Sequence, residues 1–275
     1  MRRRYRHKWA REIGFGVLVL LGIVMMIPDV RAVPNGGYAH PEVLIQPEEL
    51  KVRIDKRDPH IRIIDIREKL KYLVGHIPGA VHVWRPDIVD NNHPIPGMMA
   101  PKERIESLLG DLSISEKNTI IINSDGPDNG RLWWILAYYG LPLHQLRILD
   151  GGLDGWKARG YPTEMLPPKI EKTLFRLPKG ENIRKPLLCA LPEVRLALRD
   201  RSRVVLDVRS QKEFLGEDLR DGAVKPGRIP GVVWIEWKET LVDKGPFKNF
   251  WKSAEEMKRI YAAKGVTPDK DIFMY

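Results

Sequence analysis

The residues best suited to chemistry occur as two pairs of opposite charge. Asp65 and Arg67 follow the apolar run "IRII", and Asp207 and Arg209 follow the similar run "RVVL". Such a pair can orient a charged substrate, or it can fix a neighbouring loop through an ion pair and hydrogen bonds. We expect both pairs to anchor loops, and we regard Asp207 and Arg209 as candidates for supporting a functional site.

Two side chains are candidate nucleophiles, and neither has an activating partner in the local sequence. Ser124 opens the loop "SDGPDNG", in which Asp125 and Asp128 add negative charge. A serine nucleophile needs an adjacent base, so we predict a structural role for Ser124. Cys189, the only cysteine, lies in "PLLCALPEV" at the start of a predicted helix, where no histidine or cation favours a thiolate. We predict that it is a small buried hydrophobic residue.

Glu213 and Arg228 lie in or near the loops that follow Asp207, where each either supports a site or meets solvent. The sequence around Arg228, "GRIPG", resembles the earlier "GHIPG", so Arg228 corresponds in position to His76. His76 and His82 lack the ligand spacing of a zinc site, so we expect no metal. The indole rings of the second half are expected to pack rather than to stack on a ligand: Trp234, Trp237 and Trp251.

The two charged pairs belong to an internal repeat, "IRIIDIREKLKYLVGHIPGAVHVW" and "RVVLDVRSQKEFLGEDLRDGAVKPGRIPGVVWIEW". From Gly79 the chain runs 44 residues, through a predicted helix, to Asn123 at the end of "TIIIN". From Gly231 it runs 44 residues, through another predicted helix, to Tyr275 at the end of "DIFMY". Tyr275 therefore corresponds to Asn123, and the next position would correspond to Ser124.

Strands alternate with helices in each copy, which predicts an α/β fold with a mainly parallel sheet flanked by helices. After Asn123 the first copy continues through a helix, "RLWWILAYYG", a strand, "QLRIL", and the turn "DGGLDGWKARGYP". The second copy lacks these parts, roughly 40 residues judged by its sister unit, so we expect it to be incomplete. We divide the chain into a first domain at 42–165, a proline-rich extended linker at 166–188 and a second domain at 189–275.

The first 32 residues have the composition of an export signal. A basic stretch precedes an uncharged apolar run at 13–27, and Val30-Arg31-Ala32 offers a cleavage site. The apolar run is shorter than the roughly 20 residues of a spanning helix, which favours a cleaved signal over an anchor. We expect an exported, periplasmic or cell-envelope protein that contacts the membrane only through this segment, if it stays attached. Without it the net charge falls from +10 to +5, too weak for a nucleic-acid binder.

Several of these patterns together resemble the tandem rhodanese-like sulfurtransferases, the group of thiosulfate and 3-mercaptopyruvate sulfurtransferases. They are Asp-x-Arg before "GHIPGA", then "LDGGLDGWKARGYP", and in the second copy "LDVRSQKEFLGE" and "GRIPG". The resemblance covers about 42–275 and implies two rhodanese-like domains, the first catalytically silent with Ser124 in its loop. It implies no cofactor, a small anionic sulfur donor, and a thiol or cyanide acceptor.

The resemblance also implies a mechanism. A cysteine directly after the central strand of the second domain attacks the donor, becomes a persulfide and passes the outer sulfur to the acceptor. That cysteine would directly follow Tyr275, so no catalytic residue is present in the chain given, which we expect to be an inactive fragment.

Two functions remain open from the sequence. The first is an exported sulfurtransferase. The second is a non-catalytic module of the same fold that binds small anions or a protein partner. Phosphatase activity on the related cysteine-loop plan is disfavoured, because it needs the same missing cysteine.

Overall fold

A parallel sheet organises the first half of the protein, which we call the first lobe. The computed structural model describes residues 37–179, 183–220 and 223–275, and its first sheet has the order β1-β5-β4-β2-β3 with every pair parallel. Parallel neighbours need crossover connections, and helices provide them. The strands are β1 (Leu44–Ile45), β2 (Ile61–Asp65), β3 (Val81–His82), β4 (Thr119–Asn123) and β5 (Leu146–Leu149), and the helices are α1 (Pro47–Asp55), α2 (Lys69–Leu73), α3 (Lys102–Asp111), α4 (Asp128–Tyr138) and α5 (Gly152–Ala158).

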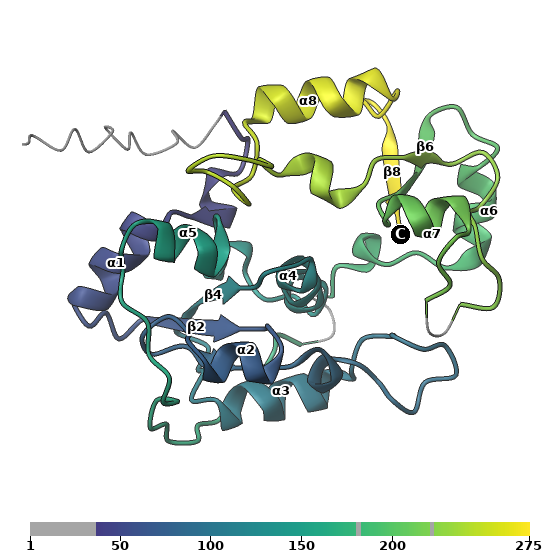
Figure 1. Cartoon of the computed structure of the whole chain (residues 1–275). Coiled ribbons are helices and arrows are strands. Elements are labelled where there is room, and N and C mark those ends of the chain that lie inside the picture. Colours follow the sequence, from purple (N-terminus) through teal and green to yellow (C-terminus); the bar gives the residue numbers. More distant parts are fainter. Residues whose placement is uncertain (1–36, 180–182, 221–222) are drawn as a thin grey trace, which may run out of the picture. The chain divides into compact units, whose positions relative to one another are not determined.

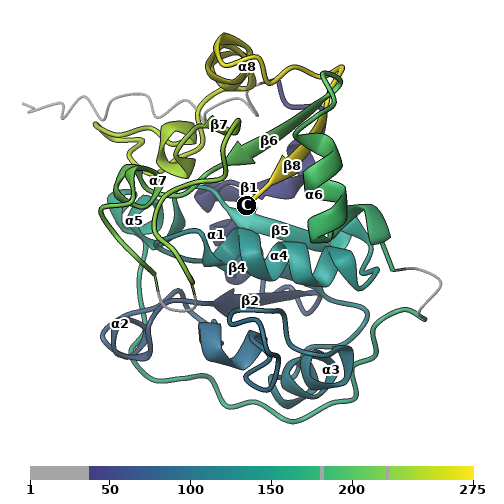
Figure 2. The same ribbon diagram turned by 90° about the vertical axis from the view of Figure 1, so that its right-hand side faces the viewer.

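The central strand β4 is buried on both faces. Ile120, Ile121 and Ile122 have no exposed surface, as expected for a β-branched run in a parallel sheet. Ile121 packs with Leu50 of α1 and Trp156 of α5, whereas its two neighbours pack with residues of α3 and α4. Figure 2 shows α4 lying along β5. Helices on both faces thus fix β4, and with it the loop that follows Asn123.

A second, smaller parallel sheet organises the second lobe, with the order β7-β6-β8. Figure 2 shows these three strands side by side, and Figure 1 marks the chain's last residue at the end of β8. The elements of this lobe are α6 (Leu191–Ala197), β6 (Arg203–Asp207), α7 (Gln211–Leu215), β7 (Val233–Trp234), α8 (Ala254–Ala263) and β8 (Asp271–Met274).

The two sheets share one pairing register at their central strands. In the first sheet Asp65 pairs with Asn123, whose carbonyl accepts a hydrogen bond of 2.9 Å from the Ile66 N–H. In the second sheet the carbonyl of Tyr275 accepts the matching bond of 3.0 Å from the Val208 N–H. The correspondence of Asn123 with Tyr275, predicted from equal spacing, is confirmed by these contacts.

Burial differs between the corresponding strands β4 and β8. By the same register Ile120 corresponds to Ile272 and Ile122 to Met274. The two β4 side chains are fully buried, whereas Ile272 is 48 % and Met274 63 % exposed. In the first lobe α3 and α4 pack on this face and β5 pairs along the free edge, so β8 exposes to solvent side chains whose counterparts in β4 are buried.

The connector predicted at 166–188 is fixed to the first lobe in its described part. Its described residues, 166–179 and 183–188, form no helix or strand before a short 3-10 helix at Lys185–Leu187, in agreement with the extended form expected. Phe175 and Leu177 are nevertheless 1 % and 5 % exposed and belong to the core of the first lobe. The N–H of Leu177 donates to a carboxylate oxygen of Glu106 at 2.8 Å. The connector is therefore a strap on α3 rather than a free spacer.

The predicted export signal lies outside the described residues. Those that are described all belong to one compact unit. Within these ranges, no helix combines the length and the apolar character that a membrane crossing needs.

Candidate functional site

The carboxyl end of β6 carries a buried carboxylate gripped by an arginine. Asp207 has no exposed surface, and Arg209 donates to its two oxygens from Nε at 3.0 Å and Nη2 at 2.6 Å. The same Nη2 also donates to the carbonyl of Gly227 at 2.9 Å. The pair therefore holds the loop that leads into β7, which is the anchoring role expected for it.

The first lobe repeats this arrangement with the same geometry. Arg67 donates to Asp65 from Nε at 2.8 Å and from Nη2 at 2.6 Å, and its Nη2 donates to the carbonyl of Gly75 at 2.8 Å. Arg67 is only 6 % exposed. In both lobes, therefore, the same Asp–Arg ion pair and one hydrogen bond to a glycine carbonyl hold the loop after the strand, although the two loops differ in length.

Opposing effects set the ionisation of the Asp207 pair. Burial by itself raises the pKa of the Asp207 carboxyl, but the hydrogen bonds from Arg209 outweigh burial and hold that pKa below its ordinary value. The hydrogen bond to Asp207 raises the pKa of Arg209 in turn. Both groups are therefore charged at neutral pH, and they form a fixed ion pair at the end of the second sheet.

The side chain of Tyr275 completes this cluster. The guanidinium of Arg209 lies over the Tyr275 ring, 5.1 Å from its centroid, and the phenol oxygen accepts a hydrogen bond of 3.4 Å from the Ile229 N–H. Burial, reinforced by the neighbouring Asp207, raises the pKa of this phenol. The sequence argument used Tyr275 only as a position in a count. The predicted register already placed this aromatic residue next to Asp207 and Arg209. That position was the signal that could have identified Tyr275 as a residue of the site.

Glu213 lies at the start of α7 and stabilises that helix end. Its carboxylate accepts hydrogen bonds from Ser210 Oγ at 2.6 Å and from the Ser210 N–H at 3.2 Å, forming a capping box. Its other oxygen lies 3.6 Å from Arg220 Nε. The structure thus gives Glu213 a local role beside Arg209 rather than a direct contact with Asp207.

Arg228 takes the place that His76 has in the first lobe. Its guanidinium lies 4.4 Å from the centroid of the Phe214 ring, and its Nη1 donates to the Phe214 carbonyl at 3.3 Å. His76 stacks on Tyr72 with ring centroids 3.9 Å apart, and its Nδ1 lies 2.9 Å from the Tyr72 carbonyl. Arginine and histidine therefore make the same two contacts, and the loop geometry is kept despite the change of residue.

Ser124 is placed where the first sheet ends, and it lacks an activating base. The side chain is 8 % exposed, and its hydroxyl accepts a hydrogen bond of 3.2 Å from the backbone two residues on. The flanking carboxylates are committed elsewhere, because Asp125 pairs with Lys71 at 2.7 Å and Asp128 pairs with Arg85 at 2.9 Å. These contacts agree with a structural role for the loop.

The prediction of a buried Cys189 is wrong. The residue is exposed, and with Tyr275 and Trp134 it lines a shallow groove of about 340 Å³ beside β8. Cys189 lies just before α6. This helix packs on β6 along one side only, so residues at its start, such as Leu191 at 62 % exposure, also meet solvent. Partial burial of the sulfur atom, reinforced by the charge of Glu193, raises the pKa of the Cys189 thiol. The thiol therefore stays protonated at neutral pH, which makes it a weak nucleophile.

A buried contact fixes the second lobe against the first. Asp150, 2 % exposed, accepts hydrogen bonds of 2.9 Å from Gln46 Nε2 and from the Trp251 N–H. Next to it the ring of Phe250 lies on the backbone of Gly151. Burial raises the pKa of the Asp150 carboxyl. This contact positions the loop of the second lobe above the end of the first sheet.

We expect Asp150→Asn to keep this contact and Asp150→Ala to lose it. Asparagine still accepts from the Trp251 N–H, and its amide can donate to Gln46 Oε1, which finds no partner among the described residues. Alanine leaves two partly buried donors, Gln46 Nε2 and the Trp251 N–H, without their partner, at a cost of roughly 2 kcal/mol in the free energy of unfolding. Because the folded pKa of Asp150 is raised, protonation favours the folded wild type as the pH falls. At neutral pH the wild type should therefore be somewhat less stable than the uncharged asparagine variant. This difference in the free energy of unfolding should shrink as the pH falls toward about 4. Urea unfolding at several pH values measures all three proteins, and an asparagine variant as weak as the alanine variant would contradict this expectation.

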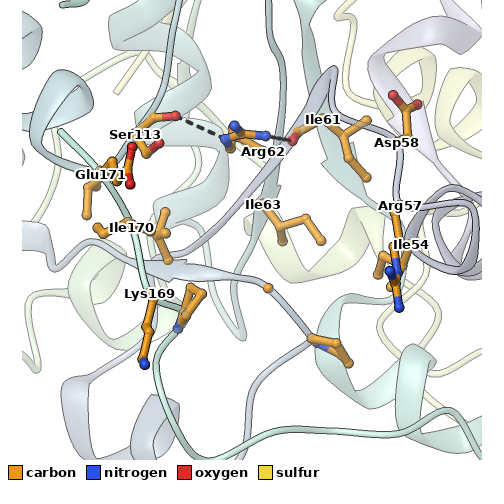
Figure 3. A pocket seen from close by; sticks show the side chains of 15 residues that line it. Ile54, Arg57, Asp58, Ile61, Arg62, Ile63, Ser113, Lys169, Ile170 and Glu171 are labelled. Carbon is orange, nitrogen blue, oxygen red and sulfur yellow. Dashed lines mark hydrogen bonds between the residues drawn. The ribbon is translucent and has the colours of Figure 1, made fainter. Parts of the chain in front are cut away.

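Two cavities of similar size lie at opposite ends of β2. One, of about 480 Å³, lies over the loop that Ser124 opens. The other, of about 500 Å³, lies at the amino end of β2, and Figure 3 shows Arg62 within it, donating to the carbonyls of Ser113 at 3.0 Å and Ile61 at 2.8 Å. The guanidinium of Arg62 is already hydrogen-bonded, and neither Ser124 nor Tyr275, at the carboxyl ends of β4 and β8, lines this cavity. We therefore do not regard it as the reaction site.

Comparisons with known proteins agree with this geometry. Residues 46–159 match the model of the rhodanese-like domain. The chain is 31 % identical to the sulfur carrier protein TtuD of Thermus thermophilus, over 87 % of this chain and 84 % of that protein. It is 29 % identical to the 3-mercaptopyruvate sulfurtransferase of Escherichia coli, over 79 % of this chain and 78 % of the relative.

A solved structure shows the same fold. The crystal structure of SseA from Escherichia coli, described as a 3-mercaptopyruvate sulfotransferase with the rhodanese fold, superposes with a TM-score of 0.68 at 25 % identity. The superposition covers 84 % of this chain and 87 % of SseA. The protein therefore belongs to the class of rhodanese-fold proteins. Its two parallel sheets each end in an aspartate that is hydrogen-bonded by an arginine. The chain belongs to the rhodanese-like sulfurtransferase family.

Proposed function

We propose that the protein transfers sulfane sulfur from thiosulfate or 3-mercaptopyruvate to a thiophilic acceptor through a cysteine persulfide. In this proposal the nucleophilic cysteine directly follows Tyr275 in a longer product of the gene. The observation that carries it is the shared register, which makes Tyr275 the counterpart of Asn123 and the next residue the counterpart of Ser124. The names of the relatives support the class of reaction.

The proposed chemistry balances without a cofactor. The thiolate attacks the outer sulfur of thiosulfate, the sulfur–sulfur bond of the donor breaks, and sulfite leaves with the electron pair. An acceptor such as cyanide then attacks the outer sulfur of the persulfide, and the cysteine leaves again as a thiolate. A loop that curls from a strand end into a helix points N–H groups inward, which stabilises each anionic sulfur species.

Two further features support this assignment. Arg209, ion-paired with Asp207, holds its guanidinium over the ring of Tyr275 and fixes the strand end from which the proposed nucleophile would follow. The exposed apolar side chains of β8, Ile272 and Met274, correspond to residues of β4 that pack against α3 and α4 in the first lobe. Further chain of the same plan after Tyr275 would bury that face and supply the loop.

The first lobe would then be catalytically silent. Its loop carries Ser124, and a hydroxyl cannot form a persulfide. We further propose that residues 1–32 direct export, so that the protein works in the periplasm or cell envelope.

A second candidate function rests on the residues described. Their only cysteine, Cys189, is exposed with a raised thiol pKa, so these residues alone suit a non-catalytic module of the rhodanese fold. A gene that stops in frame after the Tyr275 codon would favour this candidate.

The product of the complete reading frame tests the proposal. We expect it to form thiocyanate from cyanide with thiosulfate or 3-mercaptopyruvate as donor. Replacement by serine of the cysteine after Tyr275 should abolish turnover, whereas Cys189→Ser should leave it unchanged. Turnover that survives the first change, or that is lost with the second, would overturn the assignment of the nucleophile.

A further inference from the structure

The cavity of about 480 Å³ over the silent loop is built by both lobes. The first lobe contributes residues of the loop 124–130 and the turn at the start of α5, and the second lobe contributes Trp237 and Trp251. Its volume lies in the range of small-molecule sites, which are mostly apolar with a few placed polar groups. The position is the counterpart of the proposed sulfur site, yet no reactive sulfur lies among the described residues that line it.

The loop leaves room for a ligand rather than filling the space. Gly126 and Gly130 both line the cavity, and a Cβ added to either would meet nothing within 4 Å. Neither has a positive φ, so their backbones do not require glycine. Ser124, with its small side chain, also lines this space. These lining residues of the loop are small, and a larger side chain at Gly130 would extend into open space beside the cavity.

The rim of the cavity carries one acidic and one basic side chain that do not form an ion pair with each other. Asp154 and Lys157 lie three residues apart on α5, both are exposed, and neither forms an ion pair within the described part of the chain. Asp154 Oδ2 accepts a hydrogen bond of 3.0 Å from Asn249 Nδ2. The other charges in the lining are committed, since Arg67 grips Asp65 and Asp125 pairs with a lysine of α2.

We infer that this cavity binds a small zwitterion with an apolar body, such as an amino acid with an aromatic or large aliphatic side chain. The ligand's carboxylate would meet Lys157 and its ammonium Asp154, while its side chain lies between the two indoles and the loop. Apolar burial supplies affinity, and the paired charges select against molecules that carry only one of them. Met274 and Val208, the neighbours of Tyr275 and Arg209, also line the cavity, but Tyr275 and Arg209 themselves do not. Binding of a ligand by the 275-residue chain therefore tests this inference without any sulfur transfer.

Three probes of similar shape test the charge requirement on the 275-residue chain by calorimetry. L-phenylalanine carries both charges, phenylacetate only the negative one and phenethylamine only the positive one. We expect L-phenylalanine to bind at least about tenfold more tightly than either of the others, the ratio that one lost ion pair of roughly 1.4 kcal/mol produces. Equal binding of the three probes, or no binding of L-phenylalanine, would overturn the inference.

Variants locate the site. Gly130→Leu should abolish binding by filling the free volume, and Lys157→Met should weaken L-phenylalanine at least tenfold while leaving phenethylamine unchanged. Lys117→Met is the matched control, because Lys117 is an exposed lysine at the amino end of β4, and it should bind as the wild type does. Thermal melting verifies that each variant is folded. L-phenylalanine binding that persists in a folded Gly130→Leu variant would place the ligand elsewhere and contradict the inference.

Discussion

The 275-residue chain is expected to produce no thiocyanate from cyanide with either thiosulfate or 3-mercaptopyruvate. Sulfur transfer through a persulfide needs a thiolate, and the only thiol in the chain, that of Cys189, is protonated at neutral pH because partial burial raises its pKa. Ser124, at the matching strand end of the first lobe, cannot hold a sulfane sulfur. A colorimetric thiocyanate assay at neutral pH measures this directly.

The control for this expectation is Cys189→Ser in the same chain. Both proteins should give the rate of the uncatalysed reaction. A rate above that level in the wild type, lost in Cys189→Ser, would show that Cys189 is the nucleophile, and the proposed position after Tyr275 would then be wrong.

The largest expected effect on stability comes from Gly151→Ala. A Cβ on Gly151 would lie 2.1 Å from a ring carbon of Phe250, and the backbone has a φ of +72°. The φ strain costs roughly 1 to 2 kcal/mol, and the clash in a packed contact adds roughly 1 to 3 kcal/mol. We expect urea unfolding to show a loss of about 3 kcal/mol, with the ring of Phe250 forced off the first lobe.

Gly160→Ala separates the clash from the backbone strain. Gly160 has a φ of +70°, and a Cβ there would meet nothing within 4 Å, so this variant should lose only the strain energy. A double-mutant cycle of Gly151→Ala with Phe250→Leu should show a coupling of about 1 kcal/mol or more, because the smaller side chain removes part of the clash. Equal losses in Gly151→Ala and Gly160→Ala would mean that the Phe250 contact does not hold the lobes together.

The fold was predictable where local patterns decide it. The run Ile120–Ile122 is β-branched and apolar throughout, which predicts a strand buried on both faces, and it lies in the centre of its sheet. Asp-x-Arg recurs at both strand ends, and equal spacing to Asn123 and Tyr275 predicted the pairing register. Loops of different length did not disturb this register, because each is tied back by its own arginine.

The parts that escaped prediction depend on contacts between distant segments. Phe250 contacts Gly151, and Trp251 donates a hydrogen bond to Asp150, although about a hundred residues separate the partners in sequence. The hydrophobic periodicity of the sequence does not predict such pairs. Trp251 was expected only to pack, yet it also lines the cavity over the loop that Ser124 opens. Burial of Cys189 failed as a prediction because an apolar neighbourhood in sequence says nothing about which face of α6 is covered.

The most direct test of the proposed sulfur site is a map of the persulfide in the protein isolated from its native source. The protein is treated with thiosulfate, digested without reductant, and its peptides are examined by mass spectrometry for the gain of one sulfur atom. We predict that the sulfur lies on a cysteine directly after Tyr275, in the peptide that contains β8, and that the Cys189 peptide is unmodified. Sulfur on Cys189, or no sulfur on any peptide of an intact second lobe, would contradict the proposal.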